Sequence, residues 1–243
     1  MRMLLATHNA HKASEIASIL RDLPVEWLSL RAFPDIEEVE EDGATLEDNA
    51  AKKALLPARA SGLWTLADDS GLEVEALGGE PGVRSARYAG DGCDYAANNA
   101  KLLEALAQVP APRRRAAFRC VMALASPQGQ VILEEGRLDG VIIGAPRGEG
   151  GFGYDPIFFV PEAGKTLAEM PAEDKNALSH RSLALARMRP HLGQIASAAG
   201  PVLRTASQRG PAKCPLCGLE MDAQHCRELC PACGYQIDCS DPS

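Results

Sequence analysis

The stretch LWTLADDSGLEV, residues 63–74, places two adjacent carboxylates and a hydroxyl directly after an apolar run. Residues 63–66 predict a short buried strand, and the trio Asp68, Asp69 and Ser70 follows it. This trio is typical of a turn, because Asp, Ser and Gly are common turn formers. It also fits a metal site, since carboxylate oxygens are ligands that Mg²⁺ prefers. These residues alone leave both interpretations open, so the rest of the chain has to decide.

Length and composition indicate an ordinary globular protein. The chain has 243 residues, of which 46% are hydrophobic and 24% charged, enough for one large domain and a small appendage. A formal net charge of -8 argues against a general binder of nucleic acid or anionic membranes, which would need a basic surface. A small anionic substrate remains compatible with this charge, because a locally basic pocket can form inside an acidic protein.

The cysteines are concentrated near the C-terminus. Six of the eight follow Pro211, and this shift in composition indicates a domain boundary. We expect a main domain over residues 1–196, a linker over 197–212 and a tail over 213–243. The opening MRMLLATHNAHK is too polar for a secretory signal, and no segment approaches the ~18–20 apolar residues of a membrane span. We therefore expect a cytoplasmic protein with reduced thiols.

The periodicity of apolar residues predicts alternating strands and helices. Helical spacing in residues 16–23 is closed by Pro24, and SPQG (126–129) has the composition of a hairpin turn. Helices that precede hairpins indicate a mixed α/β sheet, not a purely parallel one. The expected helices cover residues 16–23, 49–56, 98–106 and 179–192, and the expected strands cover 3–6, 25–30, 63–66, 117–125, 131–138 and 157–160.

A first polar segment, THNAHK (7–12), lies between the first strand and the first helix. Backbone amides at a helix N-terminus, a hydroxyl and a lysine together can bind an anion. The segment lacks the glycines of a Walker loop. Taken alone, it is equally compatible with an ordinary strand–helix connection.

Acidic residues form a second candidate site. Asp68 and Asp69 would need a compensating cation if both are ionised and close together, and Mg²⁺ supplies one. The segment EEVEED (37–42) could provide a further carboxylate, although such runs commonly form a solvated face.

A third candidate comprises GFGYDP (151–156) and KNALSHR (175–181). Gly151 and Gly153 would allow close approach of the backbone to a flat ligand, and Phe152 or Tyr154 offers a ring for stacking. Phe152 could equally be a core aromatic residue. Three possible donors, which could otherwise be surface charges, are Lys175, His180 and Arg181.

Four segments resemble, in the same order, the signatures of the inosine triphosphate pyrophosphatase family. They are ATHNAHKASEI (6–16), LADDSGLEVEALGGEPGVRSARYAG (66–90), GEGGFGYDPIFFVPEAGKTLAEM (148–170) and EDKNALSHRSLAL (173–185). The resemblance covers about residues 1–195. It implies an elongated mixed α/β fold with a cleft between two lobes, a homodimer, and hydrolysis of inosine, deoxyinosine and xanthosine triphosphates to the monophosphate and pyrophosphate with Mg²⁺.

The resemblance also implies roles for individual residues. Asp69 would bind Mg²⁺ and act as general base, with Asp68 and either Glu40 or Glu41 as further metal ligands. His8 stands where the family often has glycine, so its side chain could crowd the phosphate loop or contribute a donor. The implied substrate-binding residues are Thr7, His8, Asn9, Ala10, His11, Lys12, Lys53, Ser70, Phe152, Gly153, Tyr154, Asp155, Lys175, His180 and Arg181.

Two other functions stay open at this point. One is a pyrophosphatase for modified pyrimidine nucleotides, which uses the same phosphate chemistry. The other is a nucleotide sensor that a C-terminal module recruits to a partner. The sensor is weakly motivated, because Asp69 is present and could serve as a base.

The tail contains two cysteine pairs with the spacing of a zinc ribbon. CPLCG (214–218) and CPACG (230–234) each contain a C-x₂-C pair, and twelve residues separate the two pairs, so four thiolates could bind Zn²⁺ tetrahedrally and hold a small fold together. Redox-active or disulfide-bonded cysteines are the alternative. Two basic and five acidic residues in 213–243 give a net charge of -3, which favours a protein contact or a structural role over nucleic acid. The predicted ligands are Cys214, Cys217, Cys230 and Cys233, with His225, Cys226 and Cys239 as spare candidates.

Overall fold

The computed structural model describes residues 1–92, 94–198, 222–224, 227–229 and 236–238. The chain divides into two compact units, Met1–Gly200 and Pro201–Ser243, and each is described here by itself. The boundaries expected from the sequence, 1–196, 197–212 and 213–243, stay a prediction.

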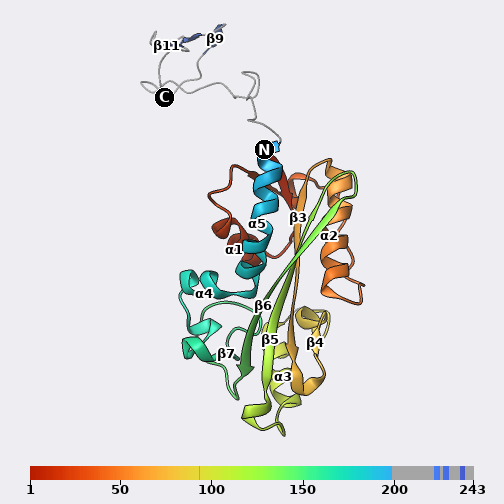
Figure 1. Cartoon of the computed structure of the whole chain (residues 1–243), viewed down its shortest axis with the longest axis vertical. Coiled ribbons are helices and arrows are strands. Elements are labelled where there is room, and N and C mark those ends of the chain that lie inside the picture. The colour runs from red at the N-terminus through yellow and green to blue at the C-terminus, as the bar shows by residue number, and fades with distance from the viewer. Residues whose placement is uncertain (93, 199–221, 225–226, 230–235, 239–243) are drawn as a thin grey trace. The chain divides into compact units, whose positions relative to one another are not determined.

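Unit 1 is built on one mixed β-sheet (Figure 1). Its strands follow the order β2-β1-β3-β5-β6-β7-β8, and β4 pairs with β3 at the side. The pairings β2–β1 and β1–β3 are parallel, whereas all later pairings are antiparallel, which confirms the predicted mixed sheet. The strands are β1 (Arg2–Leu5), β2 (Glu26–Ser29), β3 (Thr65–Val74), β4 (Pro81–Gly82), β5 (Arg115–Ala125), β6 (Val131–Ile142), β7 (Phe158–Val160) and β8 (Lys165–Thr166).

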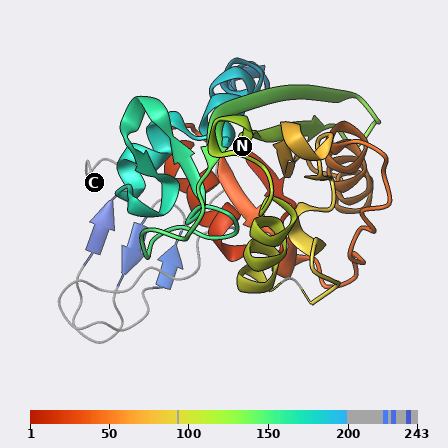
Figure 2. The same cartoon turned by 90° about the horizontal axis from the view of Figure 1, so that it is seen from below.

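Helices cover both faces of this sheet. In Figure 1, α1 and α5 lie on one side of the long strands and α2 on the other. The view from below in Figure 2 shows β6 as a long, curved strand, as expected for a twisted antiparallel pair. The helices are α1 (Ala10–Ile19), α2 (Leu46–Ser61), α3 (Tyr95–Ala105), α4 (Ala172–Leu178) and α5 (His180–Ala198).

The DDS trio lies inside a strand, so the predicted turn is wrong. β3 continues to Val74 and pairs with β5 along its whole length, with Asp68 opposite Met122 and Asp69 opposite Val121. The backbone groups of the trio are therefore satisfied by the ladder, and its polar side chains mark a site. Gly71 is required here, because a Cβ would lie 2.5 Å from the carbonyl oxygen of Gly82.

The other predicted elements agree with the structure within a few residues. The SPQG hairpin joins β5 and β6, and α5 begins at His180, one residue after the expected start of that helix. Two differences are clear. α1 covers Ala10–Ile19 instead of residues 16–23, so it begins six residues earlier and ends four residues earlier than expected, and the short helix α4 was not predicted.

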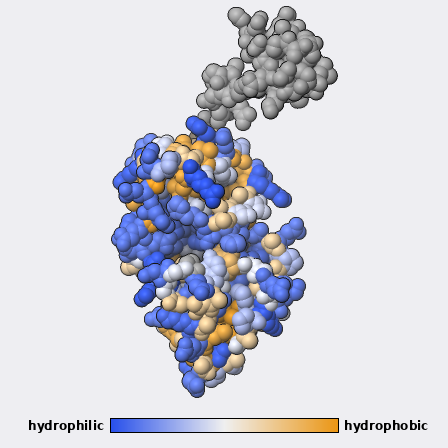
Figure 3. Space-filling view, turned by 180° about the vertical axis from the view of Figure 1, so that it is seen from behind, coloured by the Kyte–Doolittle hydropathy of each residue, from blue (hydrophilic) through white to orange (hydrophobic). Residues whose placement is uncertain are grey.

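Three hydrophobic clusters hold the unit together. One packs α1 and α5 onto the sheet, one packs α2 onto the opposite face, and one fills the end that contains α3 and β7. α5 approaches β6 most closely at Gly136, where a Cβ would lie 2.0 Å from the carbonyl oxygen of His180. The face drawn in Figure 3 is mostly hydrophilic with scattered hydrophobic residues. In the part of the chain that the structure describes, no helix is long and apolar enough to cross a membrane.

Unit 2 contains a three-stranded antiparallel sheet in the order β11-β10-β9. The predicted zinc ligands Cys214, Cys217, Cys230 and Cys233 lie outside the described residues, as do the spare candidates His225, Cys226 and Cys239. The strands are β9 (Asp222–Gln224), β10 (Arg227–Leu229) and β11 (Gln236–Asp238).

Candidate active site

Most of the predicted site residues surround one cavity in unit 1. Its volume is about 330 Å³, within the range of small-molecule sites. Four predicted residues are not among those that line it: Ala10, His11, Glu40 and Asp68. Those that line it are Thr7, His8, Asn9, Lys12, Glu41, Lys53, Asp69, Ser70, Phe152, Gly153, Tyr154, Asp155, Lys175, His180 and Arg181.

The loop between β1 and α1 forms an N-terminal cap. The Asn9 side chain accepts hydrogen bonds from the backbone amides of His11 (3.0 Å) and Lys12 (3.2 Å), and the Thr7 hydroxyl accepts one from Asn9 N. Such a cap orders the first turn of α1 at its positive end. The Lys12 side chain therefore projects from a fixed position at the cavity wall.

Asp68 is the buried counter-ion of two cations. It is 0% exposed, and its Oδ2 lies 3.0 Å from Lys12 Nζ and 3.5 Å from Arg181 Nη2. Ser70 Oγ donates to the same oxygen at 3.0 Å. Burial disfavours the charged form, but the nearby cations outweigh it and lower the pKa of Asp68, so the side chain is a carboxylate.

Asp69 has different surroundings. Its Oδ2 accepts a hydrogen bond from Asn49 Nδ2 at 3.2 Å, and its Oδ1 lies 3.5 Å from Lys53 Nζ. Lys53 also pairs with Glu41 at 2.6 Å. Burial raises the pKa of Asp69, and the cations Lys53 and Lys12 offset this only in part. Asp69 is thus a partly compensated carboxylate at the cavity wall.

The two aspartates lie on opposite faces of β3, because successive side chains of a strand alternate. Asp68 faces α1 and α5, whereas Asp69 faces α2. Whether both carboxylates bind one metal ion stays a prediction, and their different partners distinguish their roles. Asp68 is already compensated by Lys12 and Arg181, which leaves Asp69 as the candidate ligand.

The remaining carboxylates indicate whether Mg²⁺ fits. Among the described residues, no group of three or more His, Cys, Asp or Glu side chains is arranged as a metal cluster. Mg²⁺ commonly takes only one or two protein carboxylates and completes its shell with phosphate and water. Asp69 and Glu41 meet this requirement, since both line the cavity and both contact Lys53. Glu40 is exposed and does not line it, so the structure favours Glu41.

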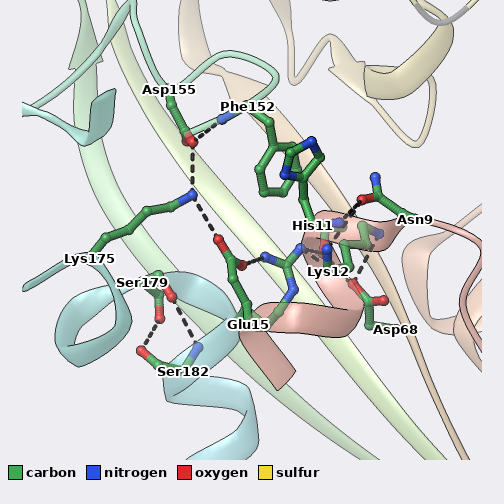
Figure 4. Close-up of polar contacts among 12 residues, drawn as sticks. Asn9, His11, Lys12, Glu15, Asp68, Phe152, Asp155, Lys175, Ser179 and Ser182 are labelled. Atoms are coloured by element: carbon green, nitrogen blue, oxygen red, sulfur yellow. Dashed lines mark hydrogen bonds and ion pairs between the residues drawn. The ribbon is translucent and has the colours of Figure 1, made fainter. Parts of the chain in front are cut away.

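Charged residues continue toward the other end of the cavity (Figure 4). Glu15 binds Lys175 through Oε1 at 2.9 Å and Arg181 through Oε2. Lys175 also binds Asp155 Oδ2 at 2.8 Å, and that oxygen accepts the backbone amide of Phe152 at 2.8 Å. Burial raises the pKa of Asp155, with Lys175 opposing this shift. A chain of ion pairs therefore joins the α1 helix to the loop that carries Phe152.

Phe152 is half-buried and lines the cavity, so it is not a core residue. Lys175 Nζ lies 4.7 Å and Arg181 Cζ 5.8 Å from its ring centroid. The neighbouring His180 is buried and stacks on Phe118, with centroids 4.7 Å apart. Burial, followed by the charges of Arg181 and Lys175, lowers the pKa of His180, so its ring is neutral.

Three residues of the site escaped sequence reasoning: Glu15, Asn49 and Tyr95. Glu15 lies three residues after Lys12, so helical spacing alone could have placed it on the same face of α1. Asn49 was assigned only to a helix, and nothing in its local sequence marks a contact with Asp69. Tyr95 begins α3 and lines the cavity, where Asn9 Nδ2 donates to its hydroxyl at 3.5 Å.

Comparison with known proteins agrees with this geometry. A model described as the Ham1 family matches residues 3–191, more than half of the chain. The chain belongs to the Ham1 family. A second model, described as zinc finger protein-like, matches residues 212–243, the region of the cysteine pairs.

Relatives are similar over nearly their whole length. The chain is 58% identical over 192 residues to the dITP/XTP pyrophosphatase of Geobacter sulfurreducens, covering 79% of this chain and 96% of the relative. It is 51% identical over 195 residues to that of Desulforamulus reducens, covering 80% and 97%. The solved structure of a HAM1 protein from Coxiella burnetii is 40% identical with a TM-score of 0.74, covering 80% of this chain and 99% of that one. The family resemblance of the sequence is thereby confirmed.

Proposed function

We propose that this protein hydrolyses non-standard purine nucleoside triphosphates, inosine, deoxyinosine and xanthosine triphosphates, to the monophosphate and pyrophosphate. The observation that carries the proposal is one cavity with two chemically distinct ends. At one end stand Asp69 and Lys53, suited to phosphate chemistry. At the other stand Phe152, Lys175 and Arg181, suited to a flat base with an acceptor oxygen. The names of the relatives point to the same substrates.

The phosphate end binds and orients the triphosphate. The first turn of α1 offers the positive end of the helix, and Lys12 and Lys53 add two cations. These groups offset the charge that accumulates on the departing pyrophosphate. Because Asp68 fixes Lys12 and Glu41 fixes Lys53, the cations are in place before substrate binds.

Asp69 is the proposed general base. Burial raises its pKa, which makes the carboxylate a better proton acceptor than an exposed aspartate. Asn49 and Lys53 hold it in position, so it can orient a water toward the α-phosphorus and take its proton. Asp69 and Glu41 would also hold Mg²⁺. A bound Mg²⁺ supplies electrostatic stabilisation of charge on the phosphate oxygens.

The base end distinguishes a keto oxygen from an amino group. Lys175 and Arg181 are donors only, so a purine with oxygen at position 6 can accept from them. The amino group of adenine would face further donors, which typically costs a few kcal/mol of binding (about 1–3 kcal/mol for an unsatisfied polar group). We therefore expect discrimination against adenine nucleotides.

Turnover across a panel of triphosphates tests this proposal. Purified protein with Mg²⁺ should release pyrophosphate from deoxyinosine and xanthosine triphosphates in preference to the standard deoxynucleotides. Asp69→Asn should abolish turnover while leaving the fold intact by circular dichroism. Absence of pyrophosphate from deoxyinosine triphosphate would refute the proposal. Preference for a modified pyrimidine triphosphate in a competition assay would favour the alternative substrate class.

Three further properties belong to this proposal. The family resemblance suggests a homodimer, which light scattering would test. The polar opening of the sequence suggests a cytoplasmic location, which cell fractionation would test. The zinc finger protein-like match over residues 212–243 supports a Zn²⁺ site in the tail, with a protein contact or a structural role favoured over nucleic acid. Metal analysis of the reduced, purified chain would show whether zinc is bound.

A further inference from the structure

His11, which the family resemblance implies to be a substrate-binding residue, contacts Phe152 and does not line the cavity. Its imidazole stacks on Phe152, with ring centroids 5.3 Å apart and planes inclined by 16° (Figure 4). Phe152 lines the cavity and His11 does not. The imidazole therefore packs against the Phe152 ring without itself forming part of the cavity wall.

His11 is well placed to hold this ring still. Its backbone amide donates to Asn9 Oδ1 at 3.0 Å in the first turn of α1. The same helix is tied to the sheet through Lys12 and Asp68, and to the base end through Glu15. The imidazole is thus carried by a helix that is anchored at both ends of the site.

The Phe152 loop needs such support. Phe152 lies between Gly151 and Gly153, whose φ angles of 72° and 63° are left-handed values that glycine adopts easily. The backbone is held by Asp155 Oδ2, which accepts the Phe152 amide, and by Asn99, which donates to the Gly153 carbonyl at 3.0 Å. These bonds fix the backbone and leave the orientation of the ring to the side chains around it, of which His11 is the one stacked nearly parallel to it.

We propose that His11 is a positioning residue for base recognition: its ring backs Phe152 and sets the plane on which the purine stacks. This deepens the proposed function and rests on it. Tyr95, whose ring lies 6.1 Å from Phe152 at 44°, supports the ring from a second direction. The helix that presents phosphate donors therefore also sets the platform for the base.

Binding of the two halves of the substrate separates this role from phosphate binding. Calorimetry with inosine monophosphate reports on the base, and calorimetry with inorganic tripolyphosphate reports on the phosphate end. His11→Ala should weaken the binding of inosine monophosphate about two- to tenfold, which corresponds to the energy typical of an aromatic pair. The affinity for tripolyphosphate should stay within about twofold of the wild-type value. His11→Phe keeps a flat ring without ring nitrogens and should restore the affinity for inosine monophosphate.

Two further variants sharpen the test. His191→Ala removes a histidine of α5 that pairs with Glu134 of β6, and neither residue lines the cavity, so this variant should bind both ligands as the wild type does. In a Phe152→Ala background, His11→Ala should cause no additional loss, because its effect acts through that ring. Because His11 is exposed, the His11→Ala and His11→Phe variants should unfold at the wild-type temperature.

Several outcomes would overturn the inference. One is a His11→Ala variant that binds inosine monophosphate as tightly as the wild type. If His11→Ala weakened the binding of tripolyphosphate equally, His11 would act on the phosphates. If His11→Phe bound inosine monophosphate as weakly as His11→Ala, the effect would come from the ring nitrogens. A wild-type chain that binds no inosine monophosphate would also overturn it, whereas a wild-type chain that releases no pyrophosphate from deoxyinosine triphosphate would contradict the proposed function itself.

Discussion

Neutralising Asp68 and neutralising Asp69 should affect stability in different ways, although the residues are neighbours in β3. Asp68→Asn and Asp69→Asn are the same nearly isosteric change. Asp68 is the counter-ion of Lys12 and Arg181, whereas Asp69 is held at the cavity wall with burial opposing its charge. Each variant is therefore the matched control of the other.

The larger loss is expected for Asp68→Asn. Removing one partner from a buried ion pair costs about 3–5 kcal/mol, because the other charge is left uncompensated. Arg181 keeps Glu15, and the Lys12 side chain is 15% exposed, which places the expected loss near the lower limit, about 3 kcal/mol. The lowered pKa means that this contribution is present above the unfolded-state pKa and disappears as pH falls through the folded-state value.

The expected change for Asp69→Asn is small. Its pKa is raised in the folded state, so above that value the charged carboxylate opposes folding, and a neutral side chain removes this term. Lys53 retains Glu41 at 2.6 Å and is not left unpaired. We expect the free energy of unfolding at neutral pH to stay within about 1 kcal/mol of the wild type, or to rise slightly.

Urea unfolding of the metal-free chain, followed by circular dichroism, measures both values. With a slope of about 2 kcal/mol/M, a loss of about 3 kcal/mol lowers the midpoint by about 1.5 M. If Asp68→Asn changed the free energy of unfolding by less than about 1 kcal/mol, the assignment of Asp68 as a structural counter-ion would fail. Equal destabilisation by the two variants would refute their separation onto two faces.

Three other predictions follow from the same contacts. In metal-free protein, NMR titration should give a pKa for Asp69 above that of an ordinary aspartate and a pKa for Asp68 below it. Added Mg²⁺ should lower the pKa of Asp69, because a cation favours the carboxylate; a pKa of Asp69 that Mg²⁺ leaves unchanged would contradict the metal assignment. Gly136→Ala should lower the free energy of unfolding in urea by about 1–3 kcal/mol, since its Cβ would lie 2.3 Å from Ala184 N; wild-type stability would show that α5 can shift away from β6 without loss of stability. Deleting residues 210–243 should remove bound zinc and leave turnover of deoxyinosine triphosphate within about threefold, whereas loss of turnover in a folded truncation would place the tail in the site.

Local patterns in the sequence predicted much of the fold because they report local physics. Apolar residues at helical spacing predicted that α1 and α5 exist, since one face of each helix must be buried. SPQG predicted the hairpin because turns have their own composition. The sequence did not predict the end of α1 or the helix α4, because tertiary contacts decide the structure of such short segments.

The sequence by itself determined which residues are present for phosphate and base binding, and its motifs were specific enough to indicate the family. Only the tertiary structure decided how they are used. Asp68 and Asp69 looked like a pair in a turn, yet strand pairing with β5 sends them to opposite faces. Glu15 meets Lys175 and Arg181, and His11 meets Phe152, across more than 140 residues of chain. Such contacts depend on how distant elements pack, and no local periodicity records them.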